Sequence, residues 1–300
     1  MADAIVVTGL QKSYGVTRAV DGVDLRVGIG EIVAVLGPNG AGKTTTVEIL
    51  EGFRRRDAGT VSVLGMDPQS GGRALRTRIG IVLQSTGIEP FLTVREVVAL
   101  YGGYYPRHRD VDEVIDLVGL TEKSSSRVKT LSGGQQRRVD LALGLIGDPD
   151  LVFLDEPTTG FDPNARRGAW SIVSGLRDLG KTVLLTTHYM DEAQHLADRV
   201  VIMAGGRVVA EGPPDQLGDQ VTTRSIVRFL LPSGAALSDL PVAATPDGDA
   251  VVVETDHVTA DIAALAGWAL NRGSELDGLT VTRPSLEDVY LELTSGDDAS

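Results

Sequence analysis

A glycine-rich segment from Gly37 to Thr44 has the residue types that hold a phosphate chain. It fits the pattern GxxxxGK[ST] and lies between an expected strand and an expected helix, as that pattern requires. Glycines allow successive backbone N–H groups to point at phosphate oxygens, and the start of the helix adds a partial positive charge. Lys43 would reach the β- and γ-phosphates, and the hydroxyl of Thr44 could bind Mg²⁺. A glycine-rich turn without a ligand is the alternative.

Two acidic residues follow an apolar run from Leu151 to Leu154. Carboxylates at the C-terminal end of a central strand lie where α/β folds bind ligands, beside the expected phosphate loop. We expect Asp155 to hold Mg²⁺, directly or through water, and Glu156 to orient or deprotonate an attacking water. An acidic N-cap at a strand–helix junction is the alternative.

A second segment suited to anions is Leu131-Ser132-Gly133-Gly134-Gln135, which precedes a long helical stretch. It offers a hydroxyl and unshielded backbone N–H groups at the start of a helix. One nucleotide does not need two phosphate sites on one chain. The natural arrangement is therefore a head-to-tail dimer in which each segment closes on the nucleotide of the other chain. A serine N-cap followed by a glycine turn is the alternative.

Apolar periodicity indicates the elements that must position these residues. Strand patterns occur at residues 5–8, 23–27, 32–36, 60–64, 79–83, 151–154, 183–186, 199–203 and 207–210. Helical spacing occurs at residues 44–53, 93–100, 111–118, 133–145 and 164–179. The runs at 151–154 and 183–186 are continuous, which is typical of central parallel strands covered on both faces. The alternation of strands and helices predicts an α/β fold.

A break near Gly212-Pro213-Pro214 divides the chain. We expect residues 1–220 to form the domain that carries the motifs, and residues 221–300 to form a small C-terminal α+β domain. The order ββαβα is indicated by strand patterns at 226–231, 250–254 and 279–282 and by helical patterns at 260–270 and 285–293. The last helix has an apolar stripe of Leu286, Val289, Tyr290 and Leu293, which needs a partner surface. A regulatory or dimer-stabilising role is our hypothesis for this domain.

Composition excludes several classes of site. The chain has 300 residues, of which 42% are hydrophobic, so it can build a core. Its net charge of −13 argues against non-specific binding of nucleic acid. It has no cysteine, which excludes disulfides and zinc–thiolate sites. The start lacks the pattern of a signal peptide, and no apolar run approaches the roughly 18 residues of a membrane span. We expect a cytoplasmic protein.

Seven features in order resemble the ATP-binding cassette (ABC) family over residues 4–218. They are Tyr14, Gly37 to Thr45, Gln84, Leu131 to Gln135, Asp155-Glu156, Gly160-Phe161-Asp162-Pro163 and Thr187-His188. The resemblance implies a P-loop NTPase cassette of the α/β class. Such a cassette has a mixed central sheet, N-terminal antiparallel strands and a helical subdomain. Here a small C-terminal α+β appendix would follow it.

The family pattern implies roles for the matching residues. Tyr14 would stack on adenine, Gln84 would complete the Mg²⁺ shell and sense the γ-phosphate, and His188 would contact the γ-phosphate and support Glu156. Asp162 would cross a dimer interface; Phe161 stands where the family usually has leucine. The implied nucleotide-binding set is Tyr14, Gly37, Pro38, Asn39, Gly40, Ala41, Gly42, Lys43, Thr44, Thr45, Ser132, Gly133, Gly134 and Gln135. The implied catalytic set is Lys43, Gln84, Glu156 and His188, with Thr44, Gln84 and Asp155 as metal ligands.

Three further stretches resemble the cassette subunits of drug- and antibiotic-export systems of the ABC-2 type. They are Arg137 to Ala142, Thr187 to Ala193 and Pro284 to Thr294. This resemblance implies an ATPase that powers a separate integral-membrane permease and lies peripherally on the inner face of the plasma membrane. It also implies a homodimer or cassette pair that sandwiches two ATP, with Mg²⁺ and without nucleic acid.

Two alternatives stay open at this point. One is a cassette ATPase that acts on DNA or the ribosome, although the chain lacks the long coiled-coil insertions of such proteins. The other is a regulatory module, although Glu156 and His188 are both present.

The segment from Ile88 to Val94 is apolar and lies between an expected strand and an expected helix. Together with Tyr101, Tyr104 and Tyr105, we expect it to dock the permease. Packing of these side chains within the helical subdomain's own core is the alternative.

Overall fold

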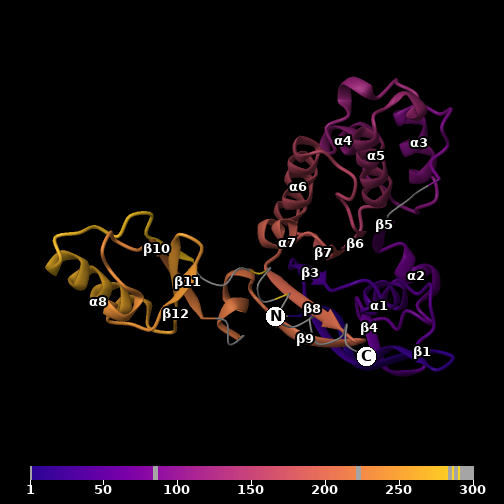
Figure 1. Cartoon of the computed structure of the whole chain (residues 1–300). Helices are drawn as coiled ribbons and strands as arrows, with labels where there is room; N and C mark the ends of the chain where they lie inside the picture. Colours follow the sequence, from indigo (N-terminus) through magenta and orange to yellow (C-terminus); the bar gives the residue numbers. More distant parts are fainter. Residues whose placement is uncertain (1, 84–86, 221–223, 283–285, 287–289, 291–300) are drawn as a thin grey trace. The chain divides into compact units, whose positions relative to one another are not determined.

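The computed structural model describes residues 2–83, 87–220, 224–282, 286 and 290. The described residues fall into two compact units, one that ends at Pro214 and one that begins at Asp215 (Figure 1). The first unit has two sheets and the second has one, and each unit has its own core. Within the described ranges, no helix combines the length and the apolar character that crossing a membrane requires.

The first unit is built on a six-stranded sheet. Its order is β5 (Ile79–Val82), β6 (Leu151–Asp155), β7 (Thr182–Thr186), β3 (Ile32–Leu36), β8 (Arg199–Ala204) and β9 (Arg207–Gly212). The first five strands run parallel, and β9 pairs antiparallel with β8. Every residue of β3 and β7 is buried, which explains why their sequences are continuous apolar runs.

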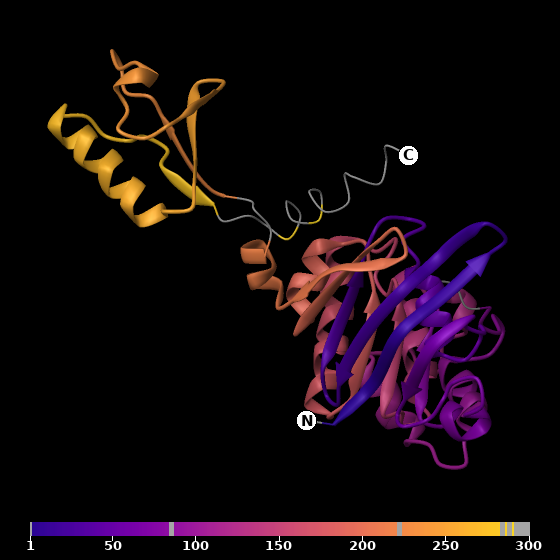
Figure 2. The same ribbon diagram turned by 90° about the horizontal axis from the view of Figure 1, so that it is seen from below.

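A second, antiparallel sheet covers the first unit on one side (Figure 2). It has the order β2 (Thr17–Gly28), β1 (Asp3–Tyr14) and β4 (Ala58–Val63). Buried and exposed residues alternate along β2, as expected for strands with one face on the core and one face in water. Ile5 and Val27 from this sheet share a core cluster with Val33 and Phe153 from the six-stranded sheet, so the two sheets pack into one core.

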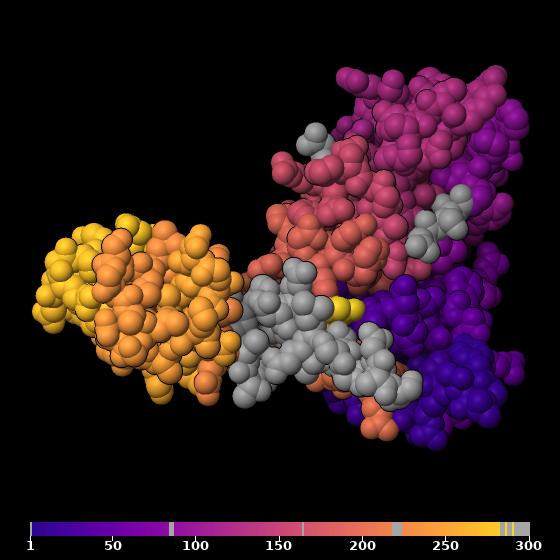
Figure 3. All heavy atoms as spheres, in the orientation of Figure 1, coloured from indigo at the N-terminus to yellow at the C-terminus, as the bar shows by residue number. Residues whose placement is uncertain are grey.

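Several helices pack against these sheets. The described helices of this part of the chain are α1 (Lys43–Leu50), α2 (Gly72–Arg76), α3 (Val94–Gly102), α4 (Val111–Leu117), α5 (Gly133–Leu145), α6 (Pro163–Asp178) and α7 (Met190–Leu196), with 3-10 turns at Thr121–Lys123, Val128–Thr130 and Pro214–Gln220. The helices α3, α4 and α5 contact one another and form a helical subdomain, whose purple to magenta atoms lie at the upper right of Figure 3. Thr93 and Ser132 begin α3 and α5 with capping boxes, in which side chain and backbone satisfy each other.

The second unit is a four-stranded antiparallel sheet with one long helix. The strand order is β11 (Thr245–Asp247), β12 (Ala250–Thr255), β10 (Ser225–Leu230) and β13 (Thr280–Thr282); α8 spans Val258–Asn271, and a 3-10 turn spans Leu237–Asp239. Its core cluster joins Val227 and Phe229 of β10, Val251 and Val253 of β12, and Leu265 of α8.

The expected fold class is confirmed: the chain is a mixed α/β cassette with N-terminal antiparallel strands and a helical subdomain. Among the described residues, the sequence did not predict α2, α7 and β11, nor the 3-10 turns at Thr121–Lys123, Val128–Thr130 and Leu237–Asp239. The strand β11 contains Pro246 and is exposed throughout, so it has neither the apolar residues nor the alternation that marks a strand. The expected helix at 285–293 lies mostly outside the described residues; Leu286, within it, is buried.

Candidate active site

The loop between β3 and α1 is shaped by glycines that no other residue could replace. A Cβ at Gly37 would lie 2.3 Å from the carbonyl oxygen of Met203, and a Cβ at Gly42 would lie 2.3 Å from the carbonyl oxygen of Ala19. Gly42 also has φ of 94°, in the left-handed region that favours glycine. The loop therefore lies directly on β8 and β2 and holds a fixed curve at the start of α1.

This loop is one wall of a pocket of about 610 Å³. The pocket is lined by Tyr14, Thr17, Arg18, Ala19, Asn39, Gly40, Ala41, Gly42, Lys43, Thr44, Thr45, Asp155, Glu156, Thr186 and Gly205. The Tyr14 ring is partly exposed, with the Lys12 ammonium 5.6 Å and the Arg54 guanidinium 5.2 Å from its centre. An aromatic side chain, a helix start and two carboxylates thus share one cavity.

Lys43 is buried and curls back over the loop. Its ammonium donates to the carbonyl oxygens of Gly37, at 2.6 Å, and Pro38, at 3.0 Å. Burial lowers the pKa of Lys43, while the charges of Glu156 and Asp155 act to raise it. The loop's own carbonyls thus satisfy the cation, and no ligand is needed to keep it in place.

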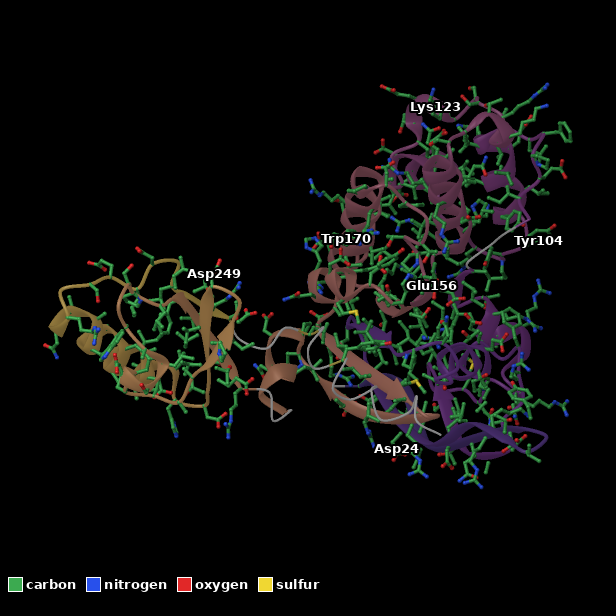
Figure 4. The ribbon with its side chains drawn as sticks, in the orientation of Figure 1. Asp24, Tyr104, Lys123, Glu156, Trp170 and Asp249 are labelled. Carbon is green, nitrogen blue, oxygen red and sulfur yellow. The ribbon has the colours of Figure 1, made fainter. Side chains whose placement is uncertain are left out.

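The two acids lie where β6 ends, beside β7. Asp155 accepts a hydrogen bond of 2.5 Å from the hydroxyl of Thr186 on β7. Glu156 has φ of 46°, a conformation that side-chain-bearing residues seldom adopt. Its carboxylate accepts a 3.0 Å hydrogen bond from the hydroxyl of Thr159, and its Oε1 is 3.4 Å from Nδ1 of His188. Figure 4 labels Glu156 at the boundary between the strands and the helices.

Arg137 stabilises this strained turn, and the sequence reading missed that role. Its buried guanidinium donates to the carbonyl oxygens of Asp155, at 2.9 Å, Pro157, at 3.2 Å, and Leu83. It therefore ties α5 to the ends of β5 and β6. The local sequence carries no signal for this role: Arg137 also pairs with Asp140 at 3.6 Å, but ion pairs at this spacing are equally typical of an exposed helix face.

A second missed group is Glu192 in the first turn of α7. It is fully buried and accepts hydrogen bonds from the Thr158 hydroxyl, at 2.8 Å, and the Trp170 indole, at 3.2 Å. Burial raises the pKa of Glu192. Through these bonds α7 and α6 are both attached to the loop that follows Glu156; Figure 4 labels Trp170 on α6.

The Ser132–Gln135 segment is not brought to this pocket. It begins α5 with a capping box: the Gln135 amide donates to the Ser132 hydroxyl at 3.3 Å, and the Ser132 amide donates to Oε1 of Gln135 at 3.0 Å. Ser132 and Gly133 are exposed. Gln84 lies outside the described residues. The chain thus brings together Tyr14, the glycine loop, both acids and, through Glu156, His188.

Comparisons with known proteins identify the family. A family model described as ABC transporter matches residues 20–159, and a model for the C-terminal domain of ABC transporter domain-containing proteins matches residues 225–285. The daunorubicin resistance ATP-binding protein DrrA3 of Streptomyces coeruleorubidus is 41% identical, covering 99% of this chain and 98% of that protein. The Nod factor export ATP-binding protein I of Rhizobium etli is 37% identical, covering 97% and 93%.

A solved structure is similar to the first unit. It is a dimeric, post-hydrolysis ATP-binding cassette bound to ADP and Pi, with a TM-score of 0.62 and 25% identity, covering 70% of this chain and 98% of that one. The similarity to drug- and antibiotic-export cassettes that the motifs indicated is confirmed by these relatives. The chain belongs to the ABC transporter family, as an ATP-binding subunit that hydrolyses ATP to drive transport.

Proposed function

We propose that the chain binds Mg-ATP in the pocket beside the glycine loop and powers a separate membrane permease that exports drugs, antibiotics or other lipophilic compounds. The substrate class rests on the relatives, which are named for daunorubicin resistance and Nod factor export and which match nearly the whole chain. The observation that carries the proposal for the site is the shared pocket of Lys43, Thr44, Asp155 and Glu156.

The donor set fits Mg²⁺ and a triphosphate. A hydroxyl, from Thr44, and a carboxylate, from Asp155, are hard oxygen ligands of the kind that Mg²⁺ prefers. Gln84 would add a third from outside the described residues. When bound, Mg²⁺ neutralises charge that develops on the phosphates.

The remaining residues have separable tasks. Lys43 would exchange the carbonyls of Gly37 and Pro38 for β- and γ-phosphate oxygens, without having to be desolvated first. Tyr14 would stack on adenine, because it is the aromatic side chain of the pocket wall. Glu156 would take the proton of the attacking water, held in orientation by Thr159 and His188.

Ser132 to Gln135 would complete the site of a second copy. The segment is exposed, it begins a 13-residue helix, and its serine hydroxyl points to the helix start. We therefore assign it to the γ-phosphate bound by the other member of a homodimer or cassette pair, with Asp162 at the interface. A similar cassette is known as a dimer with ADP and Pi, which supports this arrangement.

A surface on the helical subdomain would dock the permease. Phe91 is 63% exposed and Tyr104 is 68% exposed, and Tyr104 lies at the outer edge of the subdomain in Figure 4. Tyr105 does not belong to this surface: a Cβ at Gly147 would lie 2.4 Å from its ring, so it packs inward. With this surface engaged, the chain would lie on the inner face of the plasma membrane.

The C-terminal domain, residues 221–300, would be regulatory or would stabilise the dimer. It has its own sheet and core, and the pocket beside the glycine loop is lined wholly by residues of the first unit. We assign it no part in ATP chemistry.

Replacement of Lys43 by alanine tests the site. We expect Lys43→Ala to lose Mg-ATP affinity measured by calorimetry and to lose phosphate release, because the phosphates then have no buried cation. Lys181→Ala serves as the matched control and should keep affinity and turnover, since Lys181 pairs with Asp148 and does not line this pocket. Unchanged affinity and turnover in Lys43→Ala would sink the proposal.

A further inference from the structure

Tyr189 contacts the side chains of His188 and Arg166. The ring centres of His188 and Tyr189 are 4.0 Å apart, with a tilt of 39° between the planes. The guanidinium carbon of Arg166 lies 4.2 Å from the centre of the Tyr189 ring. Arg166 also donates to Oδ2 of Asp191 at 3.2 Å. Arg166, from the first turn of α6, therefore holds both the ring next to His188 and the start of α7.

The imidazole needs such support. His188 follows the end of β7 by two residues, and its side chain is 44% exposed. Its 3.4 Å contact with Glu156 is longer than a good hydrogen bond, so that contact alone does not fix the ring. An exposed side chain with several accessible rotamers loses entropy when it must adopt one of them, unless packing has already selected it.

We propose that Arg166 and Tyr189 are positioning residues that hold the His188 imidazole toward Glu156 and the γ-phosphate. This rests on the proposed function of His188. A cation over an aromatic face is attractive, and the planar guanidinium suits that face better than an ammonium does. The ion pair with Asp191 prevents the guanidinium from moving along the ring.

The arrangement also connects His188 to the segment assigned to the dimer interface. Asp162 accepts a 2.9 Å hydrogen bond from the amide of Ala165 at the start of α6, one residue before Arg166. The amide of Arg166 itself donates to the carbonyl oxygen of Asp162 at 3.0 Å, so the path from Asp162 through Arg166 and Tyr189 to His188 consists of direct contacts. A displacement of the first turn of α6 would therefore move the imidazole.

The test separates ring packing from general stability. We expect Tyr189→Ala and Arg166→Ala each to lower kcat on the order of 10-fold, because the imidazole is misplaced, with KM for ATP little changed. Tyr189→Phe keeps the ring and should recover most of the rate. Arg166→Lys keeps the charge but not the planar group, so an intermediate loss confined to kcat is expected; it replaces Arg166→Ala if the latter fails to fold.

A double-mutant cycle with His188→Ala decides the mechanism. If the two residues act through His188, then Tyr189→Ala and Arg166→Ala should cause no further loss of kcat in the His188→Ala background. The same fold-loss in both backgrounds, or a loss in Tyr189→Phe as large as in Tyr189→Ala, overturns the proposal. If His188→Ala itself keeps the wild-type kcat, it is the proposed role of His188 that fails, together with the inference built on it.

Discussion

The glycine loop and the Ser132–Gln135 segment are both suited to an anion at the start of a helix, but their surroundings differ. Both place backbone N–H groups at the start of a helix, after glycines or beside them. The glycine loop is pressed against β2 and β8 and opens into a pocket with two carboxylates. The Ser132–Gln135 segment is exposed and capped by its own side chains. Under the proposed function, one chain thus holds most of one site and one segment of another.

The two regions differ in how their backbone donors are satisfied without a nucleotide. The loop carbonyls accept from Lys43, but Gly42 offers no side-chain cap to α1, whereas the capping box satisfies the Ser132 and Gln135 amides at the start of α5. A helix start without a side-chain cap suits an anion. This difference favours a nucleotide at the glycine loop and, under the proposed function, leaves the Ser132–Gln135 segment to the nucleotide of a second copy.

The largest effect is expected when a methyl group is added to the glycine loop. Gly42→Ala should abolish Mg-ATP binding and lower stability by about 1–3 kcal/mol, because the new Cβ meets the Ala19 carbonyl and alanine resists this positive φ. Calorimetry and urea unfolding measure the two effects. The matched change Gly133→Ala should keep affinity in the single chain, since a Cβ there meets nothing within 4 Å. Equal losses of Mg-ATP affinity and stability in Gly42→Ala and Gly133→Ala would remove the contrast between the two regions.

A smaller effect is expected at the helix N-caps Ser132 and Thr93. Ser132→Ala should cost about 1 kcal/mol of stability and should also slow phosphate release, because the hydroxyl is lost from the partner's site. Thr93→Ala is the matched control, since Thr93 forms the same kind of capping box on α3. It should cost a similar stability and leave the rate of the isolated chain intact. If the two variants show the same rate, Ser132 is only a cap.

A separate, pH-dependent effect concerns the far end of α1. After α1 comes a buried carboxyl, Glu51, whose pKa is raised from 4.5 to about 8 by burial and by the charges of Asp155 and Glu48. The folded chain retains a proton that the unfolded chain has lost, so this group's contribution to stability falls as pH rises from about 4.5 toward 8.

Glu51→Gln should therefore be more stable than wild type by on the order of 1 kcal/mol or more at about pH 9, and nearly equal at about pH 4. Thermal unfolding at the two pH values measures this. If the stability difference between Glu51→Gln and wild type is the same at both pH values, Glu51 is not buried in its neutral form.

Much of the fold and of the candidate site could be predicted because local sequence patterns indicate the strands, the helices and the motifs between them. The expected strand Ile32–Leu36 and the expected helix from Gly133 to Leu145 match β3 and α5. The proximity of Glu156 and His188, 32 positions apart, follows once β6 and β7 are parallel neighbours. Arg137 escaped because its partners are backbone carbonyls up to 54 positions away, which leave no mark on local sequence. The packing of the Tyr105 ring near Gly147 was not predicted, because that contact is likewise non-local; the docking surface itself stays a prediction.

The most direct test of the account is the oligomeric state and turnover of Glu156→Gln in Mg-ATP. The change keeps the shape of Glu156 and removes the base, so the account predicts unchanged ATP affinity and hydrolysis slowed on the order of 10²-fold or more. Because hydrolysis no longer opens the sandwich, light scattering during size-exclusion chromatography should show an ATP-dependent dimer. A monomer at saturating ATP with wild-type turnover would contradict both the role of Glu156 and the joining of two chains around the nucleotide.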